Sequence, residues 1–170
     1  MKQNNYIEFD LKKIKQIGKK KESENWRFRT FLKQQDKNKI DNIVHRLNKE
    51  ISEKIDCTKC GNCCKELKPL VTDSEIERLS SHLKISKKIF VNKYIEKDEY
   101  GELYFKNSPC SFLVGTICSV YPNRPEDCKS FPHLHKQDFT SRLFGVLENY
   151  SICPIVFNVF EKLKIGLIIR

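Results

Sequence analysis

The stretch Cys57–Cys64, CTKCGNCC, places four cysteines within eight residues, and it decides how the rest of this 170-residue chain is interpreted. Two cysteines separated by two residues can bend the loop between them around one ion, so that both sulfurs point inward. This spacing occurs twice in overlap, from Cys57 to Cys60 and from Cys60 to Cys63. Three such thiolates can take three positions of one site, so a fourth ligand must come from Cys64 or from farther along the chain.

Four more cysteines follow at longer intervals: Cys110, Cys118, Cys128 and Cys153. Sets of thiolates favour zinc or iron–sulfur clusters over magnesium, calcium or manganese. Structural zinc sites usually use two separated cysteine pairs, whereas overlapping pairs with a distant fourth ligand are typical of ferredoxins. The expected cofactor is therefore an iron–sulfur cluster, with 4Fe–4S the favoured form, or zinc, and the spacing leaves both open.

The N-terminal stretch 1–21 contains no continuous apolar region and no small-residue cleavage site of the kind found in secretory signals. No apolar run is long enough to cross a bilayer, because Asn158, Glu161, Lys162 and Lys164 interrupt the best candidate, 152–169. We therefore expect a cytoplasmic protein without a membrane span. In a reducing compartment, eight cysteines indicate metal or redox chemistry before structural disulfides.

A redox-active thiol pair is the competing interpretation, since CTKC has the spacing of thiol oxidoreductases. Those enzymes place the pair after a strand and at the start of a helix, and no strand is predicted before Cys57. The six other cysteines are also unnecessary for that chemistry.

The formal net charge of +10 raises the question of nucleic-acid binding. Residues 1–56 hold 15 Lys/Arg against 9 Asp/Glu, and residues 57–170 hold 17 against 13, so the excess is spread thinly. There is no Arg-rich helix and no alternation of aromatic and basic residues. A solvated, lysine-rich surface is favoured, and nucleic acid is not excluded as a partner.

Apolar periodicity predicts a mainly α fold with one small β-hairpin and an irregular, cysteine-rich metal-binding centre. The predicted segments are a connection at 18–25, a short helix from Trp26, a helix at 37–55, a helix after the capping box 72–75, a helix after Ser86, a hairpin turning at Gly101, and helices at 138–147 and 154–163. We divide the chain into a basic helical N-terminal extension, 1–56, and a cysteine-cluster metal-binding domain, 57–170.

The four cysteines of CTKCGNCC, followed by PCSFL at 109–113, CSVYPNRPEDCKSFP at 118–132 and the late Cys153–Pro154, resemble the CxxCxxCC or YkgJ-type cysteine-cluster family. That family is described as zinc- or iron-chelating and is related to the flagellin lysine-N-methylases. The resemblance covers roughly 100 of the 170 residues, and it is specific because the spacing and the non-cysteine residues agree together. It implies that all eight cysteines are candidate metal ligands, in two four-thiolate sites or in one site with supporting cysteines.

Several neighbouring residues have a physical role in this interpretation. Gly61 would adopt a positive φ, so that amides turn toward sulfur. Arg124 would either offset thiolate charge or form a surface ion pair. Phe112, Tyr121 and Phe131 are expected to shield the centre. His133 and His135 are weaker ligand candidates, because the thiols already suffice.

Three functions follow. The first, which we favour, is a protein that binds zinc or an iron–sulfur cluster through this centre and transfers electrons or metal or is stabilised by it. The second is an iron–sulfur-dependent protein lysine N-methyltransferase, although the glycines form no Gly-rich loop after a strand. The third is a basic module that binds nucleic acid or a protein partner and holds structural zinc. The catalytic residues, if the chain is an enzyme, remain unknown.

Overall fold

The computed structural model describes residues 6–168 and is mainly helical, with two small antiparallel two-stranded sheets in that range. The chain divides into two compact units. The helical unit comprises Met1–Asp56 and Pro132–Arg170, and the cysteine unit comprises Cys57–Phe131. The predicted fold class is confirmed. Residues of the proposed domain 57–170 belong to both units, and its boundaries stay a prediction.

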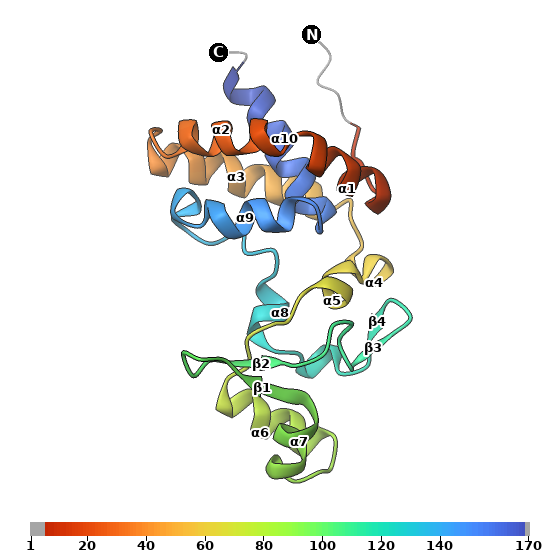
Figure 1. Ribbon diagram of the computed structural model, residues 1–170. Helices are drawn as coiled ribbons and strands as arrows, with labels where there is room; N and C mark the ends of the chain where they lie inside the picture. The colour runs from red at the N-terminus through yellow and green to blue at the C-terminus, as the bar shows by residue number, and fades with distance from the viewer. Residues whose placement is uncertain (1–5, 169–170) are drawn as a thin grey trace. The chain divides into compact units, whose positions relative to one another are not determined.

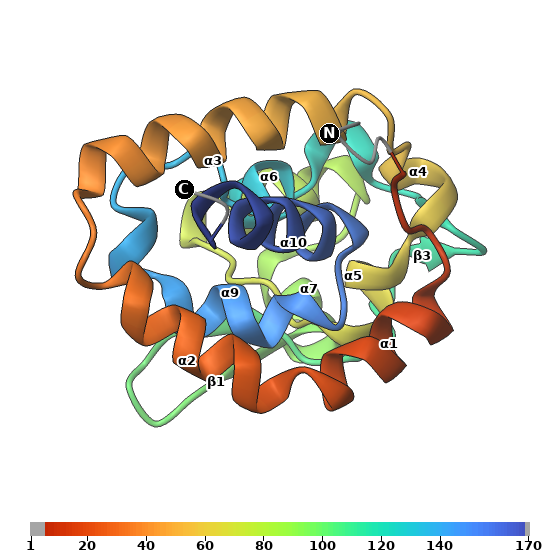
Figure 2. The same cartoon turned by 90° about the horizontal axis from the view of Figure 1, so that it is seen from above.

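The helical unit is built around its last helix. Its elements are α1 (Leu11–Lys20), α2 (Glu22–Leu32), α3 (Lys37–Ser52), the 3-10 helix η2 (Phe139–Ser141), α9 (Leu143–Tyr150) and α10 (Pro154–Ile168). Helix α10 contacts α1, α3 and α9, and Figure 2 shows it enclosed by the other helices of the unit. Every residue from 153 to 160 is buried, which explains why this segment is apolar except at Asn158, whose side chain is hydrogen-bonded.

The apolar residues of α3 recur at helical spacing and form the face of the helix that is buried. Ile40, Val44, Leu47 and Ile51 recur at helical spacing, and all four are buried, as predicted. Asp36 begins the helix, because its carboxylate accepts a hydrogen bond from the Lys39 amide at 2.7 Å. The predicted helix from Trp26 is likewise confirmed as α2, which buries Phe28 and Leu32.

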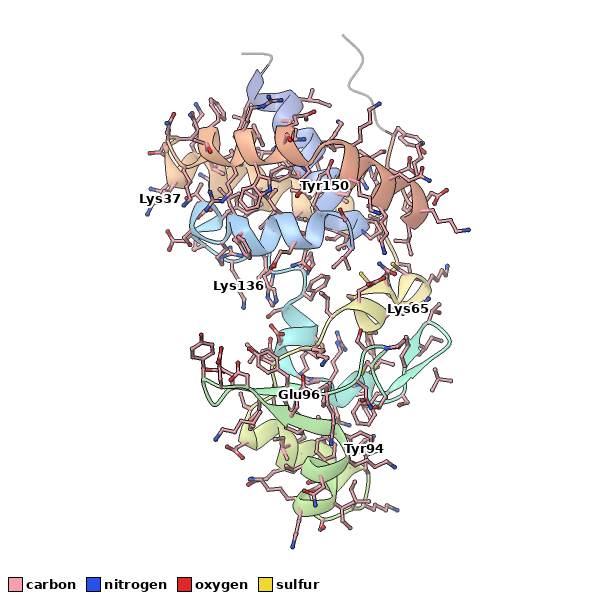
Figure 3. All side chains as sticks on the ribbon, in the orientation of Figure 1. Lys37, Lys65, Tyr94, Glu96, Lys136 and Tyr150 are labelled. Carbon is pink, nitrogen blue, oxygen red and sulfur yellow. The ribbon has the colours of Figure 1, made fainter. Side chains whose placement is uncertain are left out.

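A buried polar network joins α2, α9 and α10. The Lys164 ammonium lies 2.6 Å from the Glu24 carboxylate and 2.9 Å from that of Glu161. Tyr150, whose side chain Figure 3 shows among these helices, donates to Glu161 at 2.8 Å. Lys21 also pairs with Glu161. Buried charges persist when they are paired and hydrogen-bonded, and this network meets both conditions.

Two predicted boundaries in this unit are wrong. The expected connection at 18–25 is helical except for Lys21, since α1 ends at Lys20 and α2 starts at Glu22. Gly18 is a helical residue, and a Cβ there would lie 2.0 Å from the Ser151 hydroxyl. The helix expected from Asp138 begins later, at Leu143, because Asp138 adopts a left-handed φ of 57°.

The cysteine unit consists of short elements, shown in Figure 1. They are α4 (Cys57–Cys60), α5 (Asn62–Glu66), α6 (Asp73–His82), α7 (Lys87–Tyr94), β1 (Ile95–Lys97), β2 (Leu103–Phe105), β3 (Leu113–Val114), β4 (Ile117–Cys118), η1 (Tyr121–Asn123) and α8 (Glu126–Ser130). Strands β1 and β2 form the predicted hairpin, with Gly101 at a φ of 90° in its turn. The second hairpin, β3–β4, was not predicted.

The core of this unit is apolar and lies beside two of the cysteines. Its buried residues are Val71, Ile76, Leu79, Phe90, Ile95, Phe105, Phe112 and Val120. Cys110 and Cys118 pack against this cluster. The predicted shielding role of Phe112 fits its 5% exposure, whereas Tyr121 is 42% exposed.

Helix α6 begins with the predicted capping box. The Thr72 hydroxyl accepts from the Glu75 amide at 3.3 Å, and the Glu75 carboxylate accepts from the Thr72 amide at 2.8 Å. Ser86 caps α7 in the same manner through the Ile89 amide. Both helix starts are confirmed.

Within the part of the chain that the structure describes, no single helix is both long enough and apolar enough to cross a membrane. Helices α9 and α10 reach that length and apolarity only together, with a bend of 113° between them.

Candidate metal centre

The cysteine-rich stretch folds as two short helices joined by Gly61. Helix α4 ends at Cys60, and the next amide, that of Gly61, donates to the Cys57 carbonyl at 3.1 Å. Gly61 then adopts the left-handed conformation, with a φ of 60°, as predicted. A Cβ there would lie 3.0 Å from both the Cα and the carbonyl oxygen of Thr116, so the absent side chain admits the turn between β3 and β4. This close approach brings the strand that carries Cys118 against the CTKCGNCC stretch.

A backbone hydrogen bond fastens the second cysteine motif to the first. The Cys110 amide donates to the Cys64 carbonyl at 2.8 Å. Nearby, the Ser108 hydroxyl donates to the Lys65 carbonyl at 2.7 Å. Cys118 follows on β4, where it is paired with Leu113 of β3. Segments far apart in the sequence therefore present their cysteines together.

Four thiols of the cysteine unit lie within electrostatic reach of one another. They are those of Cys64, Cys110, Cys118 and Cys128, and every one of their six pairs interacts through charge. All four are half-buried. Cys63 belongs to the same group, because it hydrogen-bonds to the Cys64 sulfur.

The environment separates Cys64 from the other three thiols. The hydrogen bond with Cys63, opposed by burial and aided by the charge of Arg124, lowers the pKa of Cys64 to about 7. Burial raises the pKa of Cys110 and of Cys118. Burial and the charges of the neighbouring thiols raise the pKa of Cys128. The raised pKa favours the protonated thiols of Cys110, Cys118 and Cys128, and thiols lose their protons when they ligate a metal.

The predicted ligands are not all placed alike. Cys57 is exposed and Cys60 half-buried, both on α4. Cys153 lies in the helical unit at the start of α10, where it is 6% exposed. Over residues 6–168, no three His, Cys, Asp or Glu side chains converge closely enough to hold one metal ion. His133 and His135 belong to the helical unit.

The loop before Cys128 is held by contacts that sequence reasoning did not identify. The Glu75 carboxylate, which closes the capping box of α6, also accepts from the Glu126 amide at 2.6 Å and so caps α8. Arg78 donates to the carbonyls of Asn123 and Arg124 at 3.2 and 3.3 Å. No local pattern predicts these partners, because they are separated from α6 by more than 40 residues.

The donor set fits zinc or an iron–sulfur centre. Thiolates are soft ligands suited to both, the sulfurs of Cys64, Cys110, Cys118 and Cys128 are half-buried, and the charge of Arg124 favours the thiolate forms of Cys64 and Cys118.

Comparison with protein families agrees with this chemistry. Residues 56–145, which are more than half of the chain, match the model named CxxCxxCC, described as "Putative zinc- or iron-chelating domain". The chain belongs to the CxxCxxCC family. Metal binding by zinc or iron is the family's description, and it confirms the cofactor expectation at that level. The match ends before Cys153, which lies outside the CxxCxxCC model, and it spans parts of both structural units.

No curated protein and no solved structure matches the chain. The relation of this CxxCxxCC chain to the flagellin lysine-N-methylases therefore stays a prediction from the resemblance.

Proposed function

We propose that the cysteine unit binds zinc or a 4Fe–4S cluster through a thiolate centre formed by Cys64, Cys110, Cys118 and Cys128. The observation that carries this proposal is that four separate segments of the unit bring these thiols near enough to influence one another's protonation, with the Cys110 amide bonded to the Cys64 carbonyl at 2.8 Å. Burial and the neighbouring thiols raise the pKa of Cys128, and a bound cation would favour its deprotonated, ligating form.

The remaining cysteines fall into two groups in this proposal. Cys57, Cys60 and Cys63 precede Cys64 at two-residue spacing and supply further ligands, either to a second ion or as alternatives within one centre. Cys153, the eighth cysteine, belongs to the other unit and is not part of the proposed centre. The stoichiometry of bound metal distinguishes one centre from two.

The first test is the content of iron, zinc and acid-labile sulfide per chain after strictly anaerobic purification. Zinc without sulfide supports a structural or metal-carrying centre, and iron with matching sulfide supports a cluster. A chain that retains neither metal, and takes up neither on reconstitution, contradicts the proposal.

Single substitutions then test the ligand set. Cys64→Ser and Cys128→Ser are expected to lower the metal content, because each removes one thiolate from the group of four. Cys153→Ser is the matched comparison, since it removes a thiol of equal size from the helical unit. Full metal content in the Cys64→Ser and Cys128→Ser chains contradicts the proposed ligands.

A second candidate function is supported by the distribution of charge. The helical unit holds 20 Lys/Arg against 12 Asp/Glu, and the cysteine unit holds 12 against 10. On α1, the exposed lysines Lys12, Lys15, Lys19 and Lys20 form no ion pair within the described range 6–168. Unpaired lysines on one helix attract polyanions, so we propose that α1 contacts a nucleic acid.

Charge reversal tests this second function better than truncation, because residues 1–56 supply three helices of the helical unit. The triple variant Lys12→Glu, Lys15→Glu, Lys19→Glu is expected to weaken binding of a single-stranded RNA oligonucleotide and to reduce its salt dependence. The same change at Lys84, Lys88 and Lys93, on the cysteine unit, is the control. Equal effects of the two triples contradict a site on α1.

The hypothesis that the chain transfers methyl groups to lysine is based only on the resemblance to the flagellin lysine-N-methylases. Binding of S-adenosylmethionine to the metal-loaded chain, measured by calorimetry, is the observation that would support it.

A further inference from the structure

Helices α1 and α2 of the helical unit share one buried side and one outward side. They follow each other with only Lys21 between them, and Figure 2 shows both along the same edge of the unit. Their buried residues keep a single helical spacing across Lys21: Ile14, Gly18, Asn25, Phe28 and Leu32. Since the buried sides are aligned, the outward sides of the two helices are aligned as well.

The outward side is rich in cations. Its members recur at intervals of three, four or seven residues, and we call them the basic face: Lys12, Lys15, Lys19, Trp26, Arg29 and Lys33. Glu22 is the acidic residue among them. Within residues 6–168, none of the five cations forms an ion pair. At a helical rise of about 1.5 Å per residue, this row of charge is about 30 Å long, and such a row attracts a polyanion.

An aromatic pair lies on the basic face. The rings of Trp26, on α2, and Phe144, on α9, have centroids 6.1 Å apart, and the two residues are 39% and 56% exposed. The Arg29 guanidinium lies 5.3 Å from the Trp26 centroid, and its Nε has no hydrogen-bond partner in the part of the chain that the structure describes. Exposed aromatic rings beside cations are the arrangement on which the bases of a single strand stack while the cations hold its phosphates.

The stretch WRFR at 26–29 alternates aromatic and basic residues, so the expectation that the sequence holds no such alternation is wrong here. The helix separates its members. Phe28 is buried with its ring 5.3 Å from that of Phe160, whereas Trp26 and Arg29 lie on the basic face. Phe144, the second ring of the pair, comes from a helix far along the chain.

We propose that the basic face binds single-stranded nucleic acid, with a base stacked on the aromatic pair and the phosphates along the row of cations. This inference rests on the second proposed function, the contact of α1 with nucleic acid. It goes further by naming the state of the strand and the residues that touch a base. A single strand is favoured because the bases of a duplex are stacked on one another and present only their edges.

The test measures binding of the full chain to a fluorescein-labelled strand of about twelve adenosine nucleotides, a length within the range of single-strand sites, by fluorescence anisotropy. Trp26→Leu is expected to weaken binding about 5- to 150-fold, as loss of one stacking contact does. It should leave the salt dependence unchanged, because phosphate contacts set that slope. Trp26→Phe keeps a ring and should retain most of the affinity. Phe31→Leu is the matched control, since Phe31 is also on α2 and 39% exposed but lies on another side of the helix.

The strand supplies a second test. A strand of equal length with abasic residues keeps the phosphates and lacks the bases, so the wild type and Trp26→Leu should bind it equally. The adenosine strand should quench the tryptophan emission of the wild type, and this signal reports on Trp26 because the chain has one tryptophan. The quenching measurement needs no variant and is independent of any loss of folding.

The outcomes separate this inference from the function on which it rests. If the wild type binds neither strand, or if the triple charge reversal on α1 leaves binding unchanged, the nucleic-acid function and the inference fall together. If charge reversal weakens binding, but Trp26→Leu binds as tightly as Phe31→Leu and the emission is not quenched, the inference alone is overturned. Tighter binding of the matching duplex than of the single strand overturns it as well.

Discussion

The two units of this chain use different physical means to hold their structures. The helical unit has helices of 10, 11, 16, 8 and 15 residues around a buried α10. In the cysteine unit, the three helices that carry cysteines have 4, 5 and 5 residues. Helices this short are not stable by their own hydrogen bonds. We therefore expect packing to be sufficient for the helical unit, and the thiol-bearing segments of the cysteine unit to depend on a bound cation.

Removal of metal is the largest expected perturbation, and it should act on one unit only. Structural zinc contributes about 10 kcal/mol in small zinc-binding peptides, and that free energy is lost on chelation. Hydrogen exchange measured by mass spectrometry, with and without chelator, should show lost protection in peptides from 57–131 and retained protection in α3 and α10. Equal protection of residues 57–131 in both conditions would show that the cysteine unit does not depend on metal.

A truncation in the helical core should give the opposite pattern. Phe160 is fully buried, with its ring 5.3 Å from that of Phe28 and 5.6 Å from that of Tyr150. Phe160→Ala is expected to destabilise the helical unit by about 3–5 kcal/mol and to leave metal content unchanged. Urea unfolding followed by fluorescence measures this, because the single tryptophan, Trp26, lies on α2. Phe144→Ala is the control on α9, where Phe144 is 56% exposed.

A matched pair of glycines tests whether zinc binding requires the close approach of the CTKCGNCC stretch to the turn between β3 and β4. Gly61 and Gly115 both have a positive φ, of 60° and 64°, so alanine at either position is strained by about 1–2 kcal/mol. Only at Gly61 does the added Cβ meet backbone, that of Thr116. We expect Gly61→Ala to weaken zinc binding and Gly115→Ala to leave it intact. Similar zinc affinities for the two variants would show that this contact does not shape the centre.

The smallest expected effect concerns the pH dependence of the helical unit. Burial raises the pKa of Glu161, but hydrogen bonds from Lys21, Lys164 and Tyr150 lower it more, so the net shift is downward. Its contribution to stability is therefore present above the unfolded pKa, about 4.3, and is lost as the pH falls through the lower folded value. Lys164 also faces Glu24.

Glu161→Gln should be less stable than the wild type at pH 7 and should lose less stability below pH 4.3 or so. Urea unfolding at several pH values, followed by Trp26 fluorescence, gives both quantities. Parallel profiles for the two chains would show that other carboxylates govern the acid response.

Sequence patterns predicted the parts of this fold that depend on neighbours within a few residues. The apolar spacing of α3, the capping box at Thr72, the Ser86 cap and the turn at Gly101 are all as expected. The failures have a common cause. Gly18 lies inside α1, where a Cβ would meet the Ser151 hydroxyl from far along the chain, and local reasoning treats such a glycine as a break.

The eight cysteines and their spacing were enough to identify soft-metal chemistry and the family, since ligand type and loop length are properties of the chain. The sequence did not indicate which thiols lie near one another in the folded chain. The grouping of Cys64 with Cys110, Cys118 and Cys128, the location of Cys153 in the helical unit, and the double use of Glu75 depend on packing between segments tens of residues apart. The distances between such segments cannot be read from the order of residues. They are set when the chain folds and buries its apolar core.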